Sequence, residues 1–363
     1  MKTPRFSLLV TLVLVMSYLL TACAGGAVVN SWPGASADET LVYVSYQGRV
    51  LAVNASNGTL AWQFPAEDPT PAKPFYAAPA VSEDLIVVGN YGKELFALDK
   101  SGKPVWEGPF TTTAGNFAAT PLILGDVILA PASDDHMYAV DRTGKQVWKF
   151  KTRNVLLAQP SSDGEVVYLP AMDHRLYAIN LSDGSLIWES DLGSALMSTA
   201  VLDGETLYLG TMGGEVVAVN AADGTVVWRA PIGGEIWASP VLSEDTLYVG
   251  NRSDDDDTAS KVAALSTADG SVIWQLDTEA PVIAGGALLP DGVVFPLENG
   301  KLVAYPLAGG NTLWTQTING KLYSTPVVAG NNVVVPVTQN EQNQLLQAVG
   351  LNGQISWPFT APK

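Results

Sequence analysis

The sequence predicts an all-β fold, an eight-bladed β-propeller of four-stranded antiparallel blades in which a tryptophan of each blade docks on its neighbour. The first observation behind this prediction is an internal repeat with a spacing of 40 to 46 residues. The second is a content of 34 Gly and 23 Pro in 363 residues, which favours short strands joined by tight turns. The third is that no segment shows a sustained helical period.

The repeat consists of a Gly four residues before a Trp, with an Ala nine or ten residues before the same Trp. Eight of the ten Trp fit this pattern, which predicts one blade for each copy. We expect the Gly to adopt a left-handed conformation in the turn before the last strand of its blade. We also expect the Trp to lie on that strand and to pack on the neighbouring blade, near the small Ala of that blade. The predicted structural docking residues are Trp62, Trp106, Trp148, Trp188, Trp228, Trp274, Trp314 and Trp357.

The fifth repeat shows how one copy becomes four strands. Asp-Gly and Gly-Gly pairs separate its apolar runs, and these pairs tolerate the positive φ of tight hairpins. A lone sheet of this size cannot bury both of its faces, so the blades must stack radially. Because Pro33 lies near the position where other repeats carry a Pro before their first strand, the first repeat should own its first strand, and the ring should close without strand exchange. The expected strands of the fifth repeat are 198–202, 206–210, 215–220 and 225–229.

The N-terminus is predicted to be a targeting segment. Lys2 and Arg5 precede an almost wholly apolar stretch, 6–20, which is too short for a comfortable membrane span. The stretch ends in Leu-Thr-Ala followed by Cys23, which resembles the lipobox of bacterial lipoproteins. The resemblance implies a signal peptide at 1–22, a lipidated (palmitate-bearing) N-terminus and tether at 23–30, and the propeller at 31–363. An ordinary signal peptide with an incidental Cys is the alternative.

Composition limits the partners and the chemistry. Removal of the first 22 residues takes away two basic residues and no acidic one, so the net charge would change from −17 to −19. Such a surface repels nucleic acid and anionic lipid headgroups, so we expect no nucleic-acid partner and a membrane attachment that depends on the lipid. Cys23 is the only cysteine, which excludes an intrachain disulfide and a cysteine-rich metal site.

The repeat carries a family resemblance. The pattern Ala-x-(Asp/Asn)-x-x-x-Gly-x-x-x-Trp, seen at 218–228, resembles the repeat of PQQ-like, quinoprotein-type propellers and extends over about residues 32–357. A lipoprotein that consists of one bare propeller is similar to the BamB family of outer-membrane assembly factors. This resemblance implies a monomeric, non-catalytic scaffold without a cofactor, whose partners are envelope proteins, including the β-barrel assembly machinery. It also implies the periplasmic face of the outer membrane in a two-membrane cell, or the outer face of the cytoplasmic membrane in a single-membrane cell.

Two other functions remain open at the level of sequence. One is a PQQ-binding or other small-ligand-binding protein, either an oxidoreductase or a sensor. The resemblance implies that enzymes of that kind commonly carry adjacent cysteines and a Ca²⁺ site. This chain has no cysteine pair. The other is a lectin-like or substrate-capturing surface protein.

A candidate partner or ligand rim follows from the repeat register. Large apolar or aromatic residues recur three residues before the repeat Pro, where each chain segment approaches the central funnel. Inter-blade packing is the alternative reading of the same residues. The predicted rim consists of Tyr76, Phe117 (beside Ala118), Arg153 as a charged anchor, Leu157, Met197, Trp237 and Tyr323.

Two groups of polar residues lie in expected turns between second and third strands. His136 and His174 occupy adjacent repeats, but exposed turn residues are the favoured interpretation because no third ligand accompanies them. A run of four acidic residues in the sixth repeat could attract Ca²⁺, although it lacks the alternating Asp spacing of a calcium loop. We therefore predict a solvated acidic loop at Asp254, Asp255, Asp256 and Asp257.

Overall fold

The computed structural model describes residues 33–66, 73–253 and 259–362, which belong to one compact unit, Ser31–Lys363. Cys23 and the predicted signal peptide lie outside these residues, as does the acidic run Asp254–Asp257. Within the described ranges, no helix is long and apolar enough to cross a membrane.

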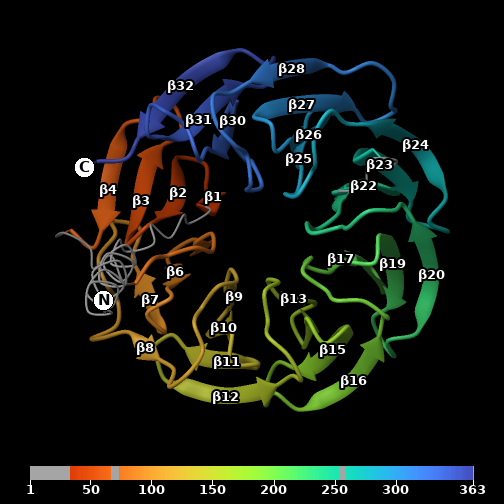
Figure 1. The fold of residues 1–363 in the computed structure, drawn as a ribbon. Helices are drawn as coiled ribbons and strands as arrows, with labels where there is room; N and C mark the ends of the chain where they lie inside the picture. Colours follow the sequence, from red (N-terminus) through yellow and green to blue (C-terminus); the bar gives the residue numbers. More distant parts are fainter. Residues whose placement is uncertain (1–32, 67–72, 254–258, 363) are drawn as a thin grey trace, which may run out of the picture. The chain divides into compact units, whose positions relative to one another are not determined.

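Eight separate four-stranded antiparallel sheets form a ring, and each sheet consists of four consecutive strands (Figure 1). The first strand of a blade faces the centre of the ring and the fourth lies at its periphery, as Figure 1 shows. The predicted all-β, eight-bladed propeller is thereby confirmed. We number the blades along the chain, so that blade 1 holds β1–β4 and blade 8 holds β29–β32.

The first half of the ring contains blades 1 to 4. Their strands are β1 (Ala35–Ala37), β2 (Leu41–Tyr46), β3 (Arg49–Asn54), β4 (Leu60–Phe64), β5 (Ala80–Val81), β6 (Ile86–Gly89), β7 (Glu94–Leu98), β8 (Phe110–Thr111), β9 (Leu122–Leu124), β10 (Val127–Pro131), β11 (His136–Asp141), β12 (Gln146–Lys151), β13 (Ser161–Ser162), β14 (Val166–Pro170), β15 (Arg175–Asn180) and β16 (Leu186–Asp191).

The second half contains blades 5 to 8. In blade 5 the last three strands match the predicted ones closely, whereas the first begins three residues later than expected. The strands are β17 (Val201–Asp203), β18 (Thr206–Gly210), β19 (Glu215–Asn220), β20 (Val226–Pro231), β21 (Val241–Ser243), β22 (Thr246–Gly250), β23 (Lys261–Ser266), β24 (Val272–Asp277), β25 (Ala287–Leu289), β26 (Gly292–Pro296), β27 (Lys301–Pro306), β28 (Trp314–Thr317), β29 (Val327–Ala329), β30 (Asn332–Pro336), β31 (Gln344–Gly350) and β32 (Ile355–Thr360).

Because every blade is an antiparallel meander, its loops fall on two faces of the ring. The connector face carries the loops between second and third strands and the connectors that join consecutive blades. There the backbone N–H of Ile232, in a connector, donates to the carbonyl of Gly214, in a second-to-third strand loop. The turn face carries the first-to-second and third-to-fourth strand turns, and there the N–H of Ala221 donates to the carbonyl of Glu205.

Each docking Trp reaches from its blade to the turn face of the following blade. Its indole Nε1 donates a hydrogen bond to a backbone carbonyl there, over distances of 2.8 to 3.1 Å. Since a buried indole N–H needs an acceptor, this bond fixes the angle between successive blades. The donor–acceptor pairs are Trp62–Lys100, Trp106–Arg142, Trp148–Leu181, Trp188–Ala221, Trp228–Thr267, Trp274–Leu307, Trp314–Leu351 and Trp357–Ala55.

The repeat Gly receives the Trp of the preceding blade. At Gly224, φ is +75° and an added Cβ would lie 2.5 Å from Cε3 of Trp188, so a side chain would meet both strain and a clash. The predicted left-handed conformation is confirmed. In blade 7 the neighbouring Gly309 takes this place beneath Trp274, whereas Gly310 has open space around it.

The predicted position of the repeat Ala was wrong. The prediction had paired the Trp with the repeat Ala of the next blade. The Trp instead lies opposite the repeat Ala of its own blade, as Trp228 does with Ala218. Seven of the eight copies show this cross-strand pair. A small residue beside the Trp leaves space for an indole that leans outward to the next blade.

Blade 2 departs from the repeat at its outer edge. Trp106 lies before the short fourth strand β8, and not on the outermost strand as predicted. Pro104 and Pro109 flank it and cannot donate to a strand ladder. The docking bond persists, since Trp106 donates to the carbonyl of Arg142 at 2.8 Å.

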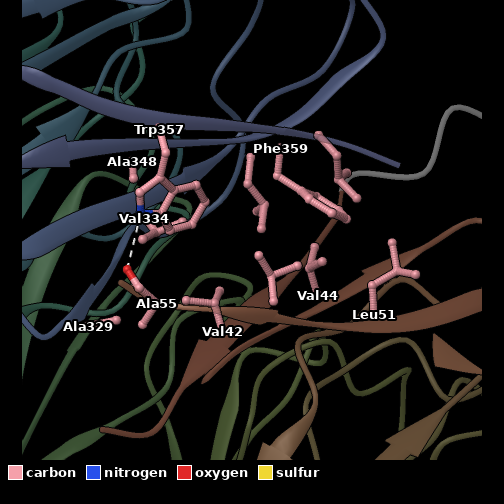
Figure 2. Packing of buried hydrophobic residues seen from close by; sticks show 12 residues of the cluster. Val42, Val44, Leu51, Ala55, Ala329, Val334, Ala348, Trp357 and Phe359 are labelled. Carbon is pink, nitrogen blue, oxygen red and sulfur yellow. Dashed lines mark hydrogen bonds between the residues drawn. The ribbon is translucent and has the colours of Figure 1, made fainter. Parts of the chain in front are cut away.

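Blades 8 and 1 close the ring without exchanging a strand, as the sequence predicted. Figure 2 shows the apolar contact between them, in which Val42, Val44 and Leu51 of blade 1 lie near Val334 and Phe359 of blade 8. The dashed line in Figure 2 joins Nε1 of Trp357 to the carbonyl of Ala55. Two further bonds cross the junction, from the Asn332 amide to the Ala55 carbonyl and from the Arg49 guanidinium to the Pro362 carbonyl.

Candidate functional site

The connectors between blades present the predicted rim on the connector face. In each of five connectors, a buried apolar residue precedes a half-buried residue of the rim, because successive side chains of an extended segment point to opposite sides. Backbone bonds to the preceding blade hold the segment, as when Leu196 donates to the Ala171 carbonyl and Ile236 to the Thr211 carbonyl. The half-buried rim residues are Tyr76, Leu157, Met197, Trp237 and Tyr323.

Phe117 does not belong to the exposed rim. Its side chain is fully buried, 6.4 Å from the ring of Tyr138, and an added Cβ on Gly89 would lie 2.2 Å from its Cβ. Ala118, three residues before Pro121, takes the rim position in this connector. The rim is therefore low at blade 3, where only a methyl group reaches the surface.

The most elaborate part of the rim lies at blades 6 to 8. The Trp237 indole donates to the Glu235 carboxylate at 2.8 Å, and the Arg252 guanidinium lies 5.6 Å from the Trp237 ring centre, within reach of a cation–π contact. The Tyr323 hydroxyl donates to the carboxylate of Glu298 at 3.3 Å. Burial, together with the negative charge and hydrogen bond of Glu298, raises the pKa of Tyr323.

An aromatic pair lies at blade 2. The rings of Tyr76 and Tyr91 are 4.1 Å apart, and Tyr91 is more than a third exposed. Burial raises the pKa of both tyrosines, and the mutual charge of the pair adds to the shift at Tyr76. Beside them, Lys73 and Glu94 form an ion pair at 2.5 Å. This part of the rim offers two tilted aromatic rings with hydroxyl groups that can donate.

The proposed charged anchor Arg153 is exposed but paired. Its guanidinium lies 2.8 Å from Glu189, which also pairs with Arg175 at 3.4 Å. The backbone N–H of Arg153 donates to the carboxylate of Asp173 at 2.9 Å. The hydrogen bond and charge of Glu189 raise the pKa of Arg153. A partner that binds Arg153 must share or displace Glu189.

His174 is exposed in the turn between β14 and β15, as the sequence predicted, whereas for His136 the prediction of an exposed turn residue was wrong, because it is the first residue of β11 and its side chain is 19% exposed. No described contact joins the two histidines. His136 begins β11, with Nδ1 2.7 Å from the carbonyl of Asp134, and its ring is 5.8 Å from that of Tyr138. His174 has a positive φ of 73°. Among the described residues, no group of three His, Cys, Asp or Glu is placed to hold a metal ion. The calcium question at Asp254–Asp257 falls outside these residues.

Sequence reasoning missed Tyr91, Glu235, Arg252 and Glu298, which complete the rim. Three of the four lie in or next to second-to-third strand loops, and these loops vary in sequence from blade to blade. Tyr91, Arg252 and Glu298 lie at the same distance after the end of the second strand of their blades, and this distance was the sequence signal that could have identified them. The described contacts of the rim include a tilted ring contact, a cation–π contact, hydrogen bonds and an ion pair.

Comparisons with known proteins decide the family. A sequence model described as outer membrane protein assembly factor BamB matches residues 46–200, 173–282 and 258–363. The chain belongs to the BamB family.

Solved structures agree with this family at the level of the fold. BamB from Moraxella catarrhalis is 17% identical, with a TM-score of 0.68 over 88% of this chain and 93% of that chain. The computationally designed Ika8 protein is 13% identical, with a TM-score of 0.70 over 90% of this chain and 95% of that chain. No curated protein matches the sequence significantly. At these levels of identity, the two solved structures show the fold alone.

Proposed function

We propose that this protein is a non-catalytic, lipid-anchored scaffold of the bacterial cell envelope that acts in outer-membrane protein assembly as a BamB-type factor. Membership of the BamB family, matched from residue 46 to 363, is the observation that carries the proposal. The half-buried aromatic residues on the connector face support it, because such residues supply much of the binding energy at protein interfaces. The partners would be envelope proteins, with the β-barrel assembly machinery first among them.

Attachment through Cys23 is part of the proposal. The chain is strongly acidic, so a lipid is the simplest means to hold it at an anionic membrane surface. Growth of producing cells with labelled palmitate should label the wild-type protein and leave Cys23→Ser unlabelled. Incorporation of label into Cys23→Ser would contradict this anchor.

The partner surface is tested by co-purification from detergent-solubilised envelopes. Trp237→Ala and Tyr323→Ala should reduce recovery of barrel-assembly proteins about tenfold or more if each is an interface hot spot. Leu288→Ala is a suitable control, because this exposed apolar residue lies on β25 and outside the rim. Equal recovery by all three variants would contradict the rim as the partner site. The alternative of a PQQ-binding protein stays a prediction, which titration with PQQ and Ca²⁺ would test by quinone absorbance.

A further inference from the structure

A side chain of the next blade reaches back across the turn face at some blade junctions. The residue whose carbonyl accepts the docking Trp lies beside the first-to-second strand turn of the preceding blade. At the junction of blades 1 and 2 this residue is Lys100, and at the junction of blades 2 and 3 it is Arg142. Both cations pair with an Asp of that turn, Lys100 with Asp38 at 2.8 Å and Arg142 with Asp84 at 2.6 Å.

The surroundings of Lys100 show which chemical group binds beside the first-to-second strand turn of a blade. Its ammonium contacts the Asp38 carboxylate and lies 5.1 Å from the ring centre of Tyr43. The Tyr43 hydroxyl donates to the same carboxylate at 2.7 Å, and the Tyr43 ring lies 5.9 Å from that of Trp62. An ammonium group is thus held by one carboxylate and an aromatic wall.

The junction of blades 4 and 5 has the same walls without the cation. Tyr168 donates to Asp163 at 3.0 Å and its ring lies 6.1 Å from that of Trp188. Asp163 also accepts bonds from the backbone N–H groups of Glu165 and Val166, as Asp38 does from its own turn. Ala221 stands in the place of Lys100, since its carbonyl accepts the Trp188 indole.

A cavity of about 280 Å³ opens where the lysine side chain would lie. Its lining includes Asp163, Tyr168, Ile187, Trp188, Glu205 and Ala221, so that two carboxylates and two aromatic rings border it.

Other junctions place the corresponding tyrosine differently. Tyr208 and Tyr248 donate directly to backbone carbonyls of the next blade, at 3.3 and 3.1 Å. Tyr168 instead donates within its own blade. Tyr43 does the same at the junction of blades 1 and 2, where Lys100 fills the site, whereas the pocket beside Tyr168 is open to solvent on one side.

We propose that this pocket between blades 4 and 5 binds the ammonium or guanidinium group of a basic side chain presented by a partner protein, in the place that Lys100 occupies at blades 1 and 2. Charge complementarity favours a basic partner, since the chain carries a formal net charge of −17. The apolar side chain of Ile187, which lines the pocket and is 48% exposed, favours a protein over a small free amine, because it can contact the stem of the inserted residue. The pocket lies on the turn face, away from the connector-face rim, so its binding can hold or fail independently of the proposed function.

Nuclear magnetic resonance of the indole N–H groups provides the test. The probes are two short flexible peptides that differ only in a central Lys or norleucine, with an Arg version as a third. The Lys and Arg peptides should shift the Trp188 indole signal saturably, in the millimolar range expected for one ion pair with a cation–π contact. The Trp62 signal should stay in place, because Lys100 already fills that site.

Two variants remove the site in different ways. Asp163→Asn keeps an oxygen acceptor for the turn but loses the charge. Ala221→Lys supplies the cation from within the chain. Each variant should lower the affinity for the Lys peptide about tenfold. Asp203→Asn is the matched control, since Asp203 occupies the corresponding turn of blade 5 and does not line the pocket. It should bind as wild type does.

Three results would overturn the proposal. They are the absence of a Trp188 shift, an equal shift with the norleucine peptide, or unchanged Lys-peptide affinity in both pocket variants. Tetramethylammonium that binds as tightly as the peptide would replace the protein partner by a small free cation. Self-association of the chain that Lys peptide disrupts would make a second copy the source of the basic side chain, and sedimentation with and without peptide detects it.

Discussion

The junction of blades 8 and 1 and the junction of blades 4 and 5 use the same Trp dock but are packed differently. At the closing junction Trp357 is 6% exposed, and an apolar cluster with two additional hydrogen bonds fills the contact. At the other junction Trp188 is only half-buried and borders a cavity. No connector joins blade 8 to blade 1, whereas a connector keeps blades 4 and 5 together. The junction that must hold by contact alone is the more densely packed, and the linked junction can leave space for a ligand.

Truncation of the docking tryptophans should separate the two junctions most strongly. Trp357→Ala should cost about 3–5 kcal/mol of unfolding free energy, because it removes a buried indole and the bond that closes the ring. Trp188→Ala should cost roughly half as much, since part of its ring already lacks neighbours. Urea denaturation followed by far-ultraviolet circular dichroism measures both values. Equal losses of unfolding free energy in the two variants would contradict the difference in packing between the junctions.

Substitution of the Gly beneath the closing Trp should give the next largest effect. An added Cβ at Gly58 would lie 2.5 Å from Cε3 of Trp357 at a φ of +72°. Gly58→Ala should therefore cost about 2–4 kcal/mol, from backbone strain together with displacement of the indole. Gly204→Ala, with φ of +54° and open space around it, carries the strain alone and should cost about 1 kcal/mol. Thermal unfolding of the pair checks the difference, and a similar loss in both would refute a steric role.

Exchange of the cation between junctions should have a smaller effect. Lys100→Ala should destabilise the fold by about 0.5–1 kcal/mol, because the ion pair and the ring contact are partly exposed. Ala221→Lys should gain a similar amount, and the gain should disappear when Asp163 is also changed to Asn. A double-mutant cycle in urea measures this coupling. If Ala221→Lys gains nothing, the two junctions differ in more than one residue.

Acid should affect the charged junctions and leave the apolar closing junction intact. Burial raises the pKa of Asp38, but bonds from Lys100, Tyr43 and the turn backbone outweigh it and hold the pKa far below its ordinary value. Because the folded-state pKa is depressed, the stabilisation is present above the unfolded pKa of about 4 and is lost as the pH falls through the folded one. Asp38→Asn should therefore show a smaller decrease in melting temperature between neutral and acidic pH than wild type, and an equal decrease would contradict it.

Alkaline pH acts on the tyrosines in the opposite sense. Burial and the bond to Asp163 raise the pKa of Tyr168. A raised folded-state pKa means that the stabilisation is complete below the unfolded pKa of about 10 and decreases above it.

The candidate sites were less predictable than the ring. The connector register placed Tyr76, Trp237 and Tyr323 at the rim, but it could not show that Phe117 points inward, because two adjacent residues compete for one exposed position. The ring contact between Tyr76 and Tyr91 and the guanidinium near Trp237 join separate loops of the chain. The distance after the second strand marks these loop positions, but the sequence alone did not show which side chains of different loops come into contact.

The sequence by itself determined the number of blades, their strands and the docking Trp, because each copy of the repeat carries its own turn residues and its own apolar pattern. Only the tertiary structure showed that the repeat Gly contacts the Trp of the preceding blade and that the repeat Ala pairs with the Trp of its own blade. It also decided that the ring closes by apolar contact, and that Ala221 leaves a cavity where Lys100 fills one. The physical reason is that local propensity acts within a blade, whereas packing between blades depends on side chains about 40 residues apart, whose contact only the closed ring defines.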